Sequence, residues 1–332
     1  MLKGDAERIQ AWDDVVRACP YASFFHTRAW AELFEKTLGT WKSDPVAVEF
    51  SDGNVAVLPL VRRVDSEHRE SMVPGMYGGP LFLKTPTEEH IEGFHGHLWF
   101  KDIFVLDNPF APFNWDPDGL IKWRMHTHLT DLSQGFDEVW GRFRTNVKRN
   151  IKKAEAANIE IRVGTSVDDI RQYFDVYEAT LPRFGDNLRS FYPIAFFEHL
   201  AALPQFGTEI KVTLASVEGR VVSGLIMLNR GDNAVAWHYS TRPDDLDTHA
   251  CPLLLRNAMQ EAASNGIRWF DFLVSGPLKG VAHFKEGFGT IRKTCNMYWS
   301  PDVTPVTERP DTGLGAAIEK SRQLREQGTT PA

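Results

Sequence analysis

The sequence contains few cysteines and lacks a long apolar run. Among 332 residues there are three cysteines, Cys19, Cys251 and Cys295, and no two of them have the spacing of metal ligands. A low, odd count is typical of a reducing compartment. No apolar stretch approaches the ~18 residues that span a bilayer, and the N-terminus, MLKGDAERIQAWDD, does not resemble a signal peptide. We therefore expect a soluble, cytoplasmic protein with no integral membrane segment.

Several catalytic signatures are absent as well. Without a GxxxxGK[ST] sequence a P-loop NTPase is disfavoured, and without a GxSxG elbow nucleophilic hydrolysis has no support. The paired histidines, 95 with 97 and 126 with 128, have no third ligand in register, so no metal is expected. The net charge of −7 lacks the basic excess of a DNA-binding protein, so any polyanion must be bound locally.

The length and the order of expected elements predict two domains. Single domains seldom exceed ~250 residues. The first half reads as two helices, a hairpin around the turn at 51–54, a further helix and two strands. A helix over 137–158 joins it to a second half, which has two helices, a three-stranded meander, a helix and a strand. We expect α/β domains over 1–145 and 146–300, each a mixed sheet flanked by helices, and a flexible tail over 301–332 that is rich in Thr, Pro and Gly.

A basic segment, FRTNVKRNIKKA, begins at Phe143 and follows Arg142. Six cations fall within twelve residues, and a helix can place several of them on one face: Arg142, Arg144, Lys148, Arg149, Lys152 and Lys153. Such a cluster suits phosphate, because it raises the local potential and arginine binds bidentately. A solvated helix face would have the same composition, so both interpretations stay open.

The sequence HFKEGFG places Lys285 between aromatic residues and before two glycines. We expect a tight loop, anchored by Phe284 and Phe288, that points the ammonium toward a phosphate or a developing oxyanion. Phe284 is also expected to bind substrate. The alternative is a surface lysine in a turn.

Weaker signals occur at three other places. In MYGGP, Tyr77 and Gly78 belong to a loop whose glycines allow close backbone approach to a ligand, although most such strings are turns. Asp107 ends an apolar strand and is a candidate base, although a turn or cap would also use it. Tyr239 lies on one face of an expected strand and is either structural or in contact with substrate.

Three stretches together resemble the FemAB family. FFHTRAWAELFEKTLG is similar to its opening pattern, KRNIKKAEAANIEI to its basic helix, and the block from WHYS to HFKEGFG to its most specific pattern. The resemblance extends over about residues 20–300 and implies two GNAT-like acyltransferase domains, GNAT being an acetyltransferase superfamily. It places Lys285 near the acyl donor, Arg149 near anionic substrate groups, and Asp107 and Tyr239 in the site.

The resemblance implies transfer of an aminoacyl group from charged tRNA to an amine of a peptidoglycan precursor, or of a peptide-like small molecule, in cell wall biogenesis. No cofactor is then required. Two departures count against a standard donor site. The helical hairpin that aids tRNA binding in some relatives has no counterpart, and the acidic segment TRPDDLDTHACP replaces the pyrophosphate loop of GNAT enzymes. An acyl-CoA-dependent N-acyltransferase acting on an envelope sugar or amine is the alternative, and a non-catalytic binding protein is a third.

Overall fold

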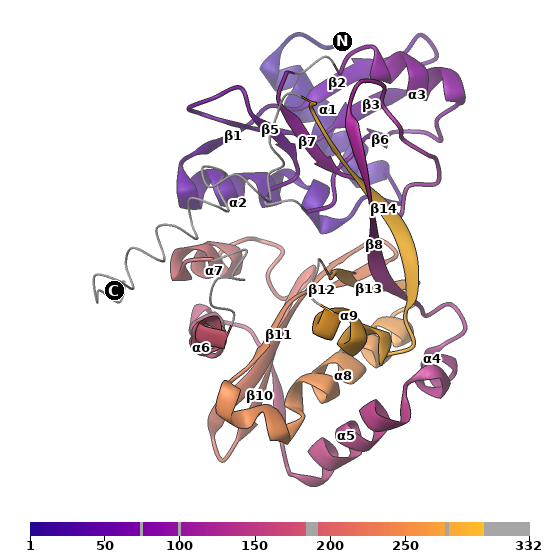
Figure 1. Ribbon diagram of the computed structural model, residues 1–332. Helices are drawn as coiled ribbons and strands as arrows, with labels where there is room; N and C mark the ends of the chain where they lie inside the picture. The colour runs from indigo at the N-terminus through magenta and orange to yellow at the C-terminus, as the bar shows by residue number, and fades with distance from the viewer. Residues whose placement is uncertain (74–75, 99–100, 184–191, 276–278, 302–332) are drawn as a thin grey trace. The chain divides into compact units, whose positions relative to one another are not determined.

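The computed structural model describes residues 1–301 except 74–75, 99–100, 184–191 and 276–278 (Figure 1). The chain divides into unit 1, which comprises Met1–Met125, Leu188–Phe196 and Cys295–Ala332, and unit 2, which comprises His126–Asn187 and Phe197–Thr294. Residues 126–145, which we expected in the first domain, therefore belong to unit 2, where Val139 and Phe143 are part of the core. The tail expected over 301–332 lies, apart from its first residue, outside the described residues.

Unit 1 contains a mixed sheet and a small antiparallel sheet. In the mixed sheet, the order is β1 (Trp41–Ser43), β4 (Val61–Arg63), β5 (Arg69–Ser71), β7 (Ile103–Leu106) and the end of β14 (Ile291–Trp299). Only the β5–β7 pair is parallel. The small sheet joins β2 (Val46–Glu49), β3 (Val55–Leu58) and β6 (Leu81–Phe82), and the helices are α1 (Asp5–Ala18), η1 (Phe24–His26), α2 (Arg28–Leu38) and α3 (Glu88–His95).

Unit 2 is built on a larger mixed sheet. Its strand order is β8 (Ile121–Asp131), β13 (Trp269–Val274), β12 (Asn233–Thr241), β11 (Arg220–Arg230), β10 (Ile210–Val217) and β9 (Glu160–Gly164). The pair β12–β13 is parallel and the others are antiparallel. The helices are α4 (Phe136–Arg142), α5 (Thr145–Ala156), α6 (Val167–Thr180), η2 (Leu181–Arg183), α7 (Ile194–Ala201), η4 (Pro243–Thr248), α8 (Ala250–Ser264) and α9 (Lys279–Glu286). The predicted fold class, two α/β halves with mixed sheets flanked by helices, is confirmed.

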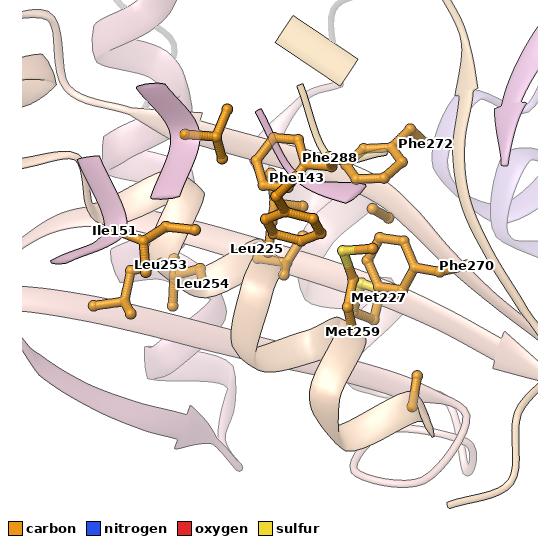
Figure 2. Packing of buried hydrophobic residues seen from close by; sticks show 14 of the residues in the cluster. Phe143, Ile151, Leu225, Met227, Leu253, Leu254, Met259, Phe270, Phe272 and Phe288 are labelled. Atoms are coloured by element: carbon orange, nitrogen blue, oxygen red, sulfur yellow. The ribbon is translucent and has the colours of Figure 1, made fainter. Parts of the chain in front are cut away.

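Helices cover both faces of the unit 2 sheet. Gly224 on β11 faces α6, where an added Cβ would lie 2.4 Å from the Tyr173 ring, so only glycine allows this close packing. The next residue, Leu225, points to the opposite face because side chains alternate along a strand. There it joins residues of α5 and α8 in the core shown in Figure 2, which contains Phe143, Ile151, Leu225, Met227, Leu253, Leu254, Met259, Phe270, Phe272 and Phe288.

The single helix expected over 137–158 is wrong. Phe143 is extended, with φ −60° and ψ 138°, and it separates α4 from α5. Its ring packs on that of Phe288 with centroids 5.2 Å apart, and the N–H of Arg144 donates to the carbonyl oxygen of Gly287 over 2.9 Å. Tertiary contacts with the segment after α9 therefore override a continuous local helix propensity.

A buried histidine connects two carboxylates in unit 1. His68 Nδ1 lies 2.7 Å from Asp102 Oδ1, and its Nε2 lies 3.1 Å from Glu70 Oε1. Since a carboxylate only accepts, both ring nitrogens donate and the ring is an imidazolium. Burial by itself lowers the pKa of His68, but the hydrogen bonds to Asp102 and Glu70 outweigh it and raise the pKa to about 9.

We predict that this histidine makes stability pH-dependent on the alkaline side. Because the folded pKa is above the ordinary value of 6.5, the stabilisation is complete below pH 6.5 and is lost as the pH rises through about 9. The difference in unfolding free energy between the wild type and His68→Asn should shrink over that window in urea titrations. His126→Asn, which removes an exposed histidine, is the control. A difference that stays constant from pH 6 to 9.5 would contradict the charged form.

Candidate functional site

A cavity of about 300 Å³ lies in unit 2, where β12 ends and α8 begins. It is lined by the end of β12, the start of α8, and single residues of α5, α6 and α9, together with their flanking turns: Asn150, Thr180, Arg183, Tyr239, Ser240, Thr241, Leu246, His249, Ala250, Cys251, Pro252 and Phe284. The predicted site residues Tyr239 and Phe284 are thus brought to one cavity from segments 45 positions apart in the sequence.

The cavity lies beyond the point where two parallel strands, β12 and β13, stop pairing. Strand β13 pairs with β12 only where Trp269–Asp271 lie opposite Asn233–Val235. The lining residues Tyr239, Ser240 and Thr241 come later on β12, beyond this pairing. A cleft beside the carboxyl end of a parallel strand is a common place for ligands in α/β proteins.

Two aromatic rings form part of the cavity wall, and Arg183 is a charged residue among those that line it. The rings of Tyr239 and Phe284 are 6.3 Å apart and tilted by 34°. Burial raises the pKa of the Tyr239 hydroxyl and raises that of the Cys251 thiol to about 12, so both stay protonated near neutral pH. Asn150, Ser240 and Thr241 supply uncharged hydrogen-bonding groups.

Part of the predicted basic cluster lies near the cavity. Burial, then the positive charges of Lys153 and Arg149, lower the pKa of His249, whose side chain lines the cavity at the start of α8, while Asp247 opposes them. Arg149, Lys152 and Lys153 are exposed. Lys148 differs, because its ammonium donates to the carbonyl oxygen of Gly141 over 3.0 Å and stacks on the Trp140 ring.

The expected geometry of Lys285 is corrected by the structure. Lys285 lies in the last turn of α9 rather than in a loop, and its side chain is buried with 4% exposure. Its Nζ donates to the carbonyl oxygens of Leu273 at 2.9 Å and Val274 at 3.0 Å. Burial lowers the pKa of Lys285 to about 8, and the charge of Asp271 opposes this shift. Two of the three ammonium donors therefore hold the end of β13.

Further buried polar groups surround this strand end, and sequence reasoning did not single out Asp271. Asp271 is fully buried and accepts hydrogen bonds from Thr127 Oγ1 at 2.7 Å and the Leu273 N–H at 2.8 Å. His128 Nδ1 lies 3.2 Å from Ser275 Oγ, and burial followed by the nearby Lys285 charge lowers the pKa of His128 to about 4. The sequence signal that could have identified Asp271 is its position as the one acidic residue within the largely apolar segment IRWFDFLV.

The remaining predicted site residues belong to unit 1. Burial raises the pKa of Asp107 to about 7, although its Oδ1 accepts from the Asn108 N–H at 2.9 Å. The Tyr77 ring is fully buried. An added Cβ on Gly78 would lie 1.8 Å from the carbonyl oxygen of Ser71, so this glycine is required for packing. His26 Nε2 lies 3.0 Å from the Gly78 carbonyl oxygen and further fixes the loop.

Within the described part of the chain, no group of three or more His, Cys, Asp and Glu side chains could hold a metal ion. None of the described helices combines the length and apolarity needed to cross a bilayer.

Comparison with known proteins identifies the type of domain that holds the cavity. Residues 141–286 match the acetyltransferase (GNAT) domain family. These residues have a GNAT-like fold. They include the helices α5–α9 and the strands β9–β13, and hence every residue that lines the cavity. No curated protein matches the chain in sequence.

Solved structures extend the similarity to the whole fold. The crystal structure of FemX has a TM-score of 0.67 and 13% identity, covering 89% of this chain and 96% of FemX. The C-terminal domain of a putative lysylphosphatidylglycerol synthetase from Agrobacterium fabrum has a TM-score of 0.56 and 14% identity, covering 97% of each chain. A Bacteroides thetaiotaomicron protein of unknown function has a TM-score of 0.53 and 12% identity, with 89% and 97% covered. The fold is FemX-like.

The electrostatic contact at the cavity rim can be measured directly. Charge reversal in Arg149→Glu should raise the pKa of His249, because a nearby negative charge favours the imidazolium. NMR titration of the His249 ring protons gives this value. The control is Lys152→Glu, on the same helix. Because Lys152 is not among the charges that shift the pKa of His249, this variant should change that pKa less. An equal response to both variants would show only a change in overall charge.

Proposed function

We propose that this protein is a cytoplasmic, Fem-like acyltransferase that moves an aminoacyl group from aminoacyl-tRNA to an amine. The acceptor is a peptidoglycan precursor or a peptide-like small molecule. The observation that carries the proposal is the cavity at the end of β12 in the GNAT-like domain, which contains the residues that match the FemAB patterns, Tyr239 and Phe284.

The charge distribution favours an aminoacyl ester over coenzyme A. A GNAT donor site for coenzyme A uses backbone N–H groups of a glycine-rich loop before the helix. Here the corresponding segment is η4, which contains three aspartates and no glycine. One of them, Asp245, is paired with Arg220 over 2.6 Å. Arg149 and Lys153, whose charges lower the pKa of His249, are suited to the phosphates next to the acceptor end of a tRNA.

The chemistry requires no covalent enzyme intermediate. The free amine attacks the ester carbonyl, a C–N bond forms, and the C–O bond to the ribose breaks while the ribose oxygen takes up a proton. Holding the two substrates together supplies much of the rate. The amine proton needs a base, and a base is most effective when its pKa is near the working pH. Asp107 in unit 1, which the FemAB resemblance proposes for this role, has a pKa raised to about 7. The third N–H of Lys285 is the candidate donor to the oxyanion.

The acyl-CoA alternative is favoured by one observation, the match of residues 141–286 to an acetyltransferase family. Incubation of the protein with an amine library and either charged tRNA or acetyl-CoA, followed by mass spectrometry, separates the two donors. A mass increase equal to an amino-acid residue supports the proposal. An acetyl increase supports the alternative, and binding of either donor without any product supports a non-catalytic binding protein.

We predict that Lys285→Met lowers both stability and activity. The carbonyl oxygens of Leu273 and Val274 would lose their donor, and an unsatisfied buried polar group costs roughly 1–3 kcal/mol. Loss of one preorganised charge contact reduces the rate by about 10²–10³. Thermal unfolding and initial rates measure the two effects, and Lys36→Met, at an exposed position on α2, is the control. Wild-type turnover in Lys285→Met would exclude a catalytic contribution.

The same lysine predicts a pH dependence. Because burial lowers its pKa to about 8, the charged form is lost as the pH rises through that value, and the rate should fall with it. The decrease should be visible in kcat between pH 7 and 9. A rate that keeps increasing to pH 9.5 would mean that the ammonium charge is not used.

A further inference from the structure

The end of β13 adopts a conformation that its residue type does not favour. Between Asp271 and Val274 the strand advances three residues while the paired strand β8 advances two, from Leu129 to Thr127. This extra residue is a β-bulge. Leu273 within it has φ 62°, in the left-handed region where a side chain other than glycine is strained. Such a conformation persists only where surrounding contacts enforce it.

Three buried groups from different elements enforce this conformation. The Asp271 carboxylate accepts from the Leu273 N–H, and Thr127 on β8 fixes the same carboxylate oxygen. Lys285 on α9 holds the carbonyl oxygens of Leu273 and Val274. Asp271 and Thr127 are fully buried and Lys285 is 4% exposed, so water does not compete for these hydrogen bonds. We call Asp271, Thr127 and Lys285 the bulge clamp.

The bulge coincides with the point where β13 stops pairing with β12. Asp271 is the last residue of β13 paired with that strand, opposite Val235, and the bulge begins immediately after it. Without its bulge, β13 would have its next backbone groups available for further pairing with the part of β12 that follows Val235. Strand β12 has a bulge of its own at Trp237, so both strands depart from regular pairing at this point. The residues of β12 that line the cavity lie in that direction along the strand, starting at Tyr239.

We propose that Asp271 is a positioning residue, which keeps Leu273 left-handed and thereby keeps β13 apart from β12 so that the cavity stays open. What the cavity binds rests on the proposed function, but the role of the bulge clamp does not. Replacing Asp271 with Ala removes the acceptor of the Leu273 N–H, so the strand end relaxes and access to the cavity decreases. Glycine adopts positive φ freely, so Leu273→Gly should restore the conformation without Asp271.

Cys251 provides a readout that needs no substrate. Its thiol lines the cavity, whereas Cys19 and Cys295 are buried with 6% and 1% exposure. Because its raised pKa leaves little thiolate near neutral pH, labelling of Cys251 is slow, but we expect it to react with a small maleimide before the two buried cysteines in the folded protein. The labelling rate at fixed pH, with the labelled residue identified by peptide mass spectrometry, reports access to the cavity.

In this assay, Asp271→Ala should label about tenfold more slowly than wild type, the order expected when one strained residue is released. The double variant Asp271→Ala/Leu273→Gly should return toward the wild-type rate. Asp271→Asn keeps an acceptor oxygen and should stay close to wild type, and Asp175→Ala, at an exposed position on α6, controls for loss of an acid. Wild-type labelling of Asp271→Ala, or a double variant as slow as Asp271→Ala, would overturn the proposal.

Two further measurements separate the possible failures. If Asp271→Ala does not fold, Thr127→Val takes its place, because it removes one contact to the same carboxylate oxygen. It is labelled with and without Leu273→Gly. Slower labelling that Leu273→Gly restores supports the proposal, and wild-type labelling, or slow labelling without restoration, overturns it. If wild type forms no product with charged tRNA or acetyl-CoA while the labelling pattern is as expected, the proposed function fails and the bulge clamp stands. When product does form, Asp271→Ala should raise KM for the donor more than it lowers kcat.

Discussion

The hydrogen bonds of the Lys285 ammonium to two consecutive backbone carbonyls are the interaction on which the architecture of unit 2 depends most. A charged group that is almost fully buried requires compensation, and here the compensation comes from oxygens that a regular strand would use for pairing. The lysine thus replaces a neighbouring strand as hydrogen-bonding partner. This substitution allows β13 to separate from β12 while the carbonyl oxygens of Leu273 and Val274 stay hydrogen-bonded, and the cavity lies next to the resulting gap.

Unit 1 uses a buried charge in a different way. His68 lies between Asp102 and Glu70 and connects β5 to the residue that precedes β7, so its charge stabilises neighbouring parts of one sheet. In unit 2, Asp271 and Lys285 are not within hydrogen-bonding contact of each other but act on the same backbone segment. Both arrangements confine ionised groups to positions with several partners, as the high cost of an unpaired buried charge requires. The His68 hydrogen bonds stabilise regular strand pairing in unit 1, whereas those of Asp271 and Lys285 stabilise a bulge in β13.

The sequence predicted the elements well wherever local signals and tertiary contacts agree. Thr27 caps α2 and Gly39 ends it with φ 66°, as their residue types indicate. The helix over 137–158 failed because nothing local reveals that Phe143 packs on Phe288. In the site, the FemAB patterns identified Tyr239 and Phe284, which share the cavity. They could not show that Lys285 points to the β13 carbonyls, nor that Asp271 and Thr127 meet, because these contacts join residues up to 144 positions apart.

One feature of the chain path has a consequence for synthesis. Strand β7, whose residues 104–106 belong to unit 1, pairs on one side with residues 297–299 of β14, which come 191 to 195 positions later in the sequence. During translation the first 125 residues leave the ribosome long before this partner exists. The nascent unit therefore has an exposed β-strand edge until residues 297–299 are made, and such edges associate with other chains. A product truncated before these residues would keep this edge permanently, so chaperone binding and degradation should distinguish it from a chain that contains them.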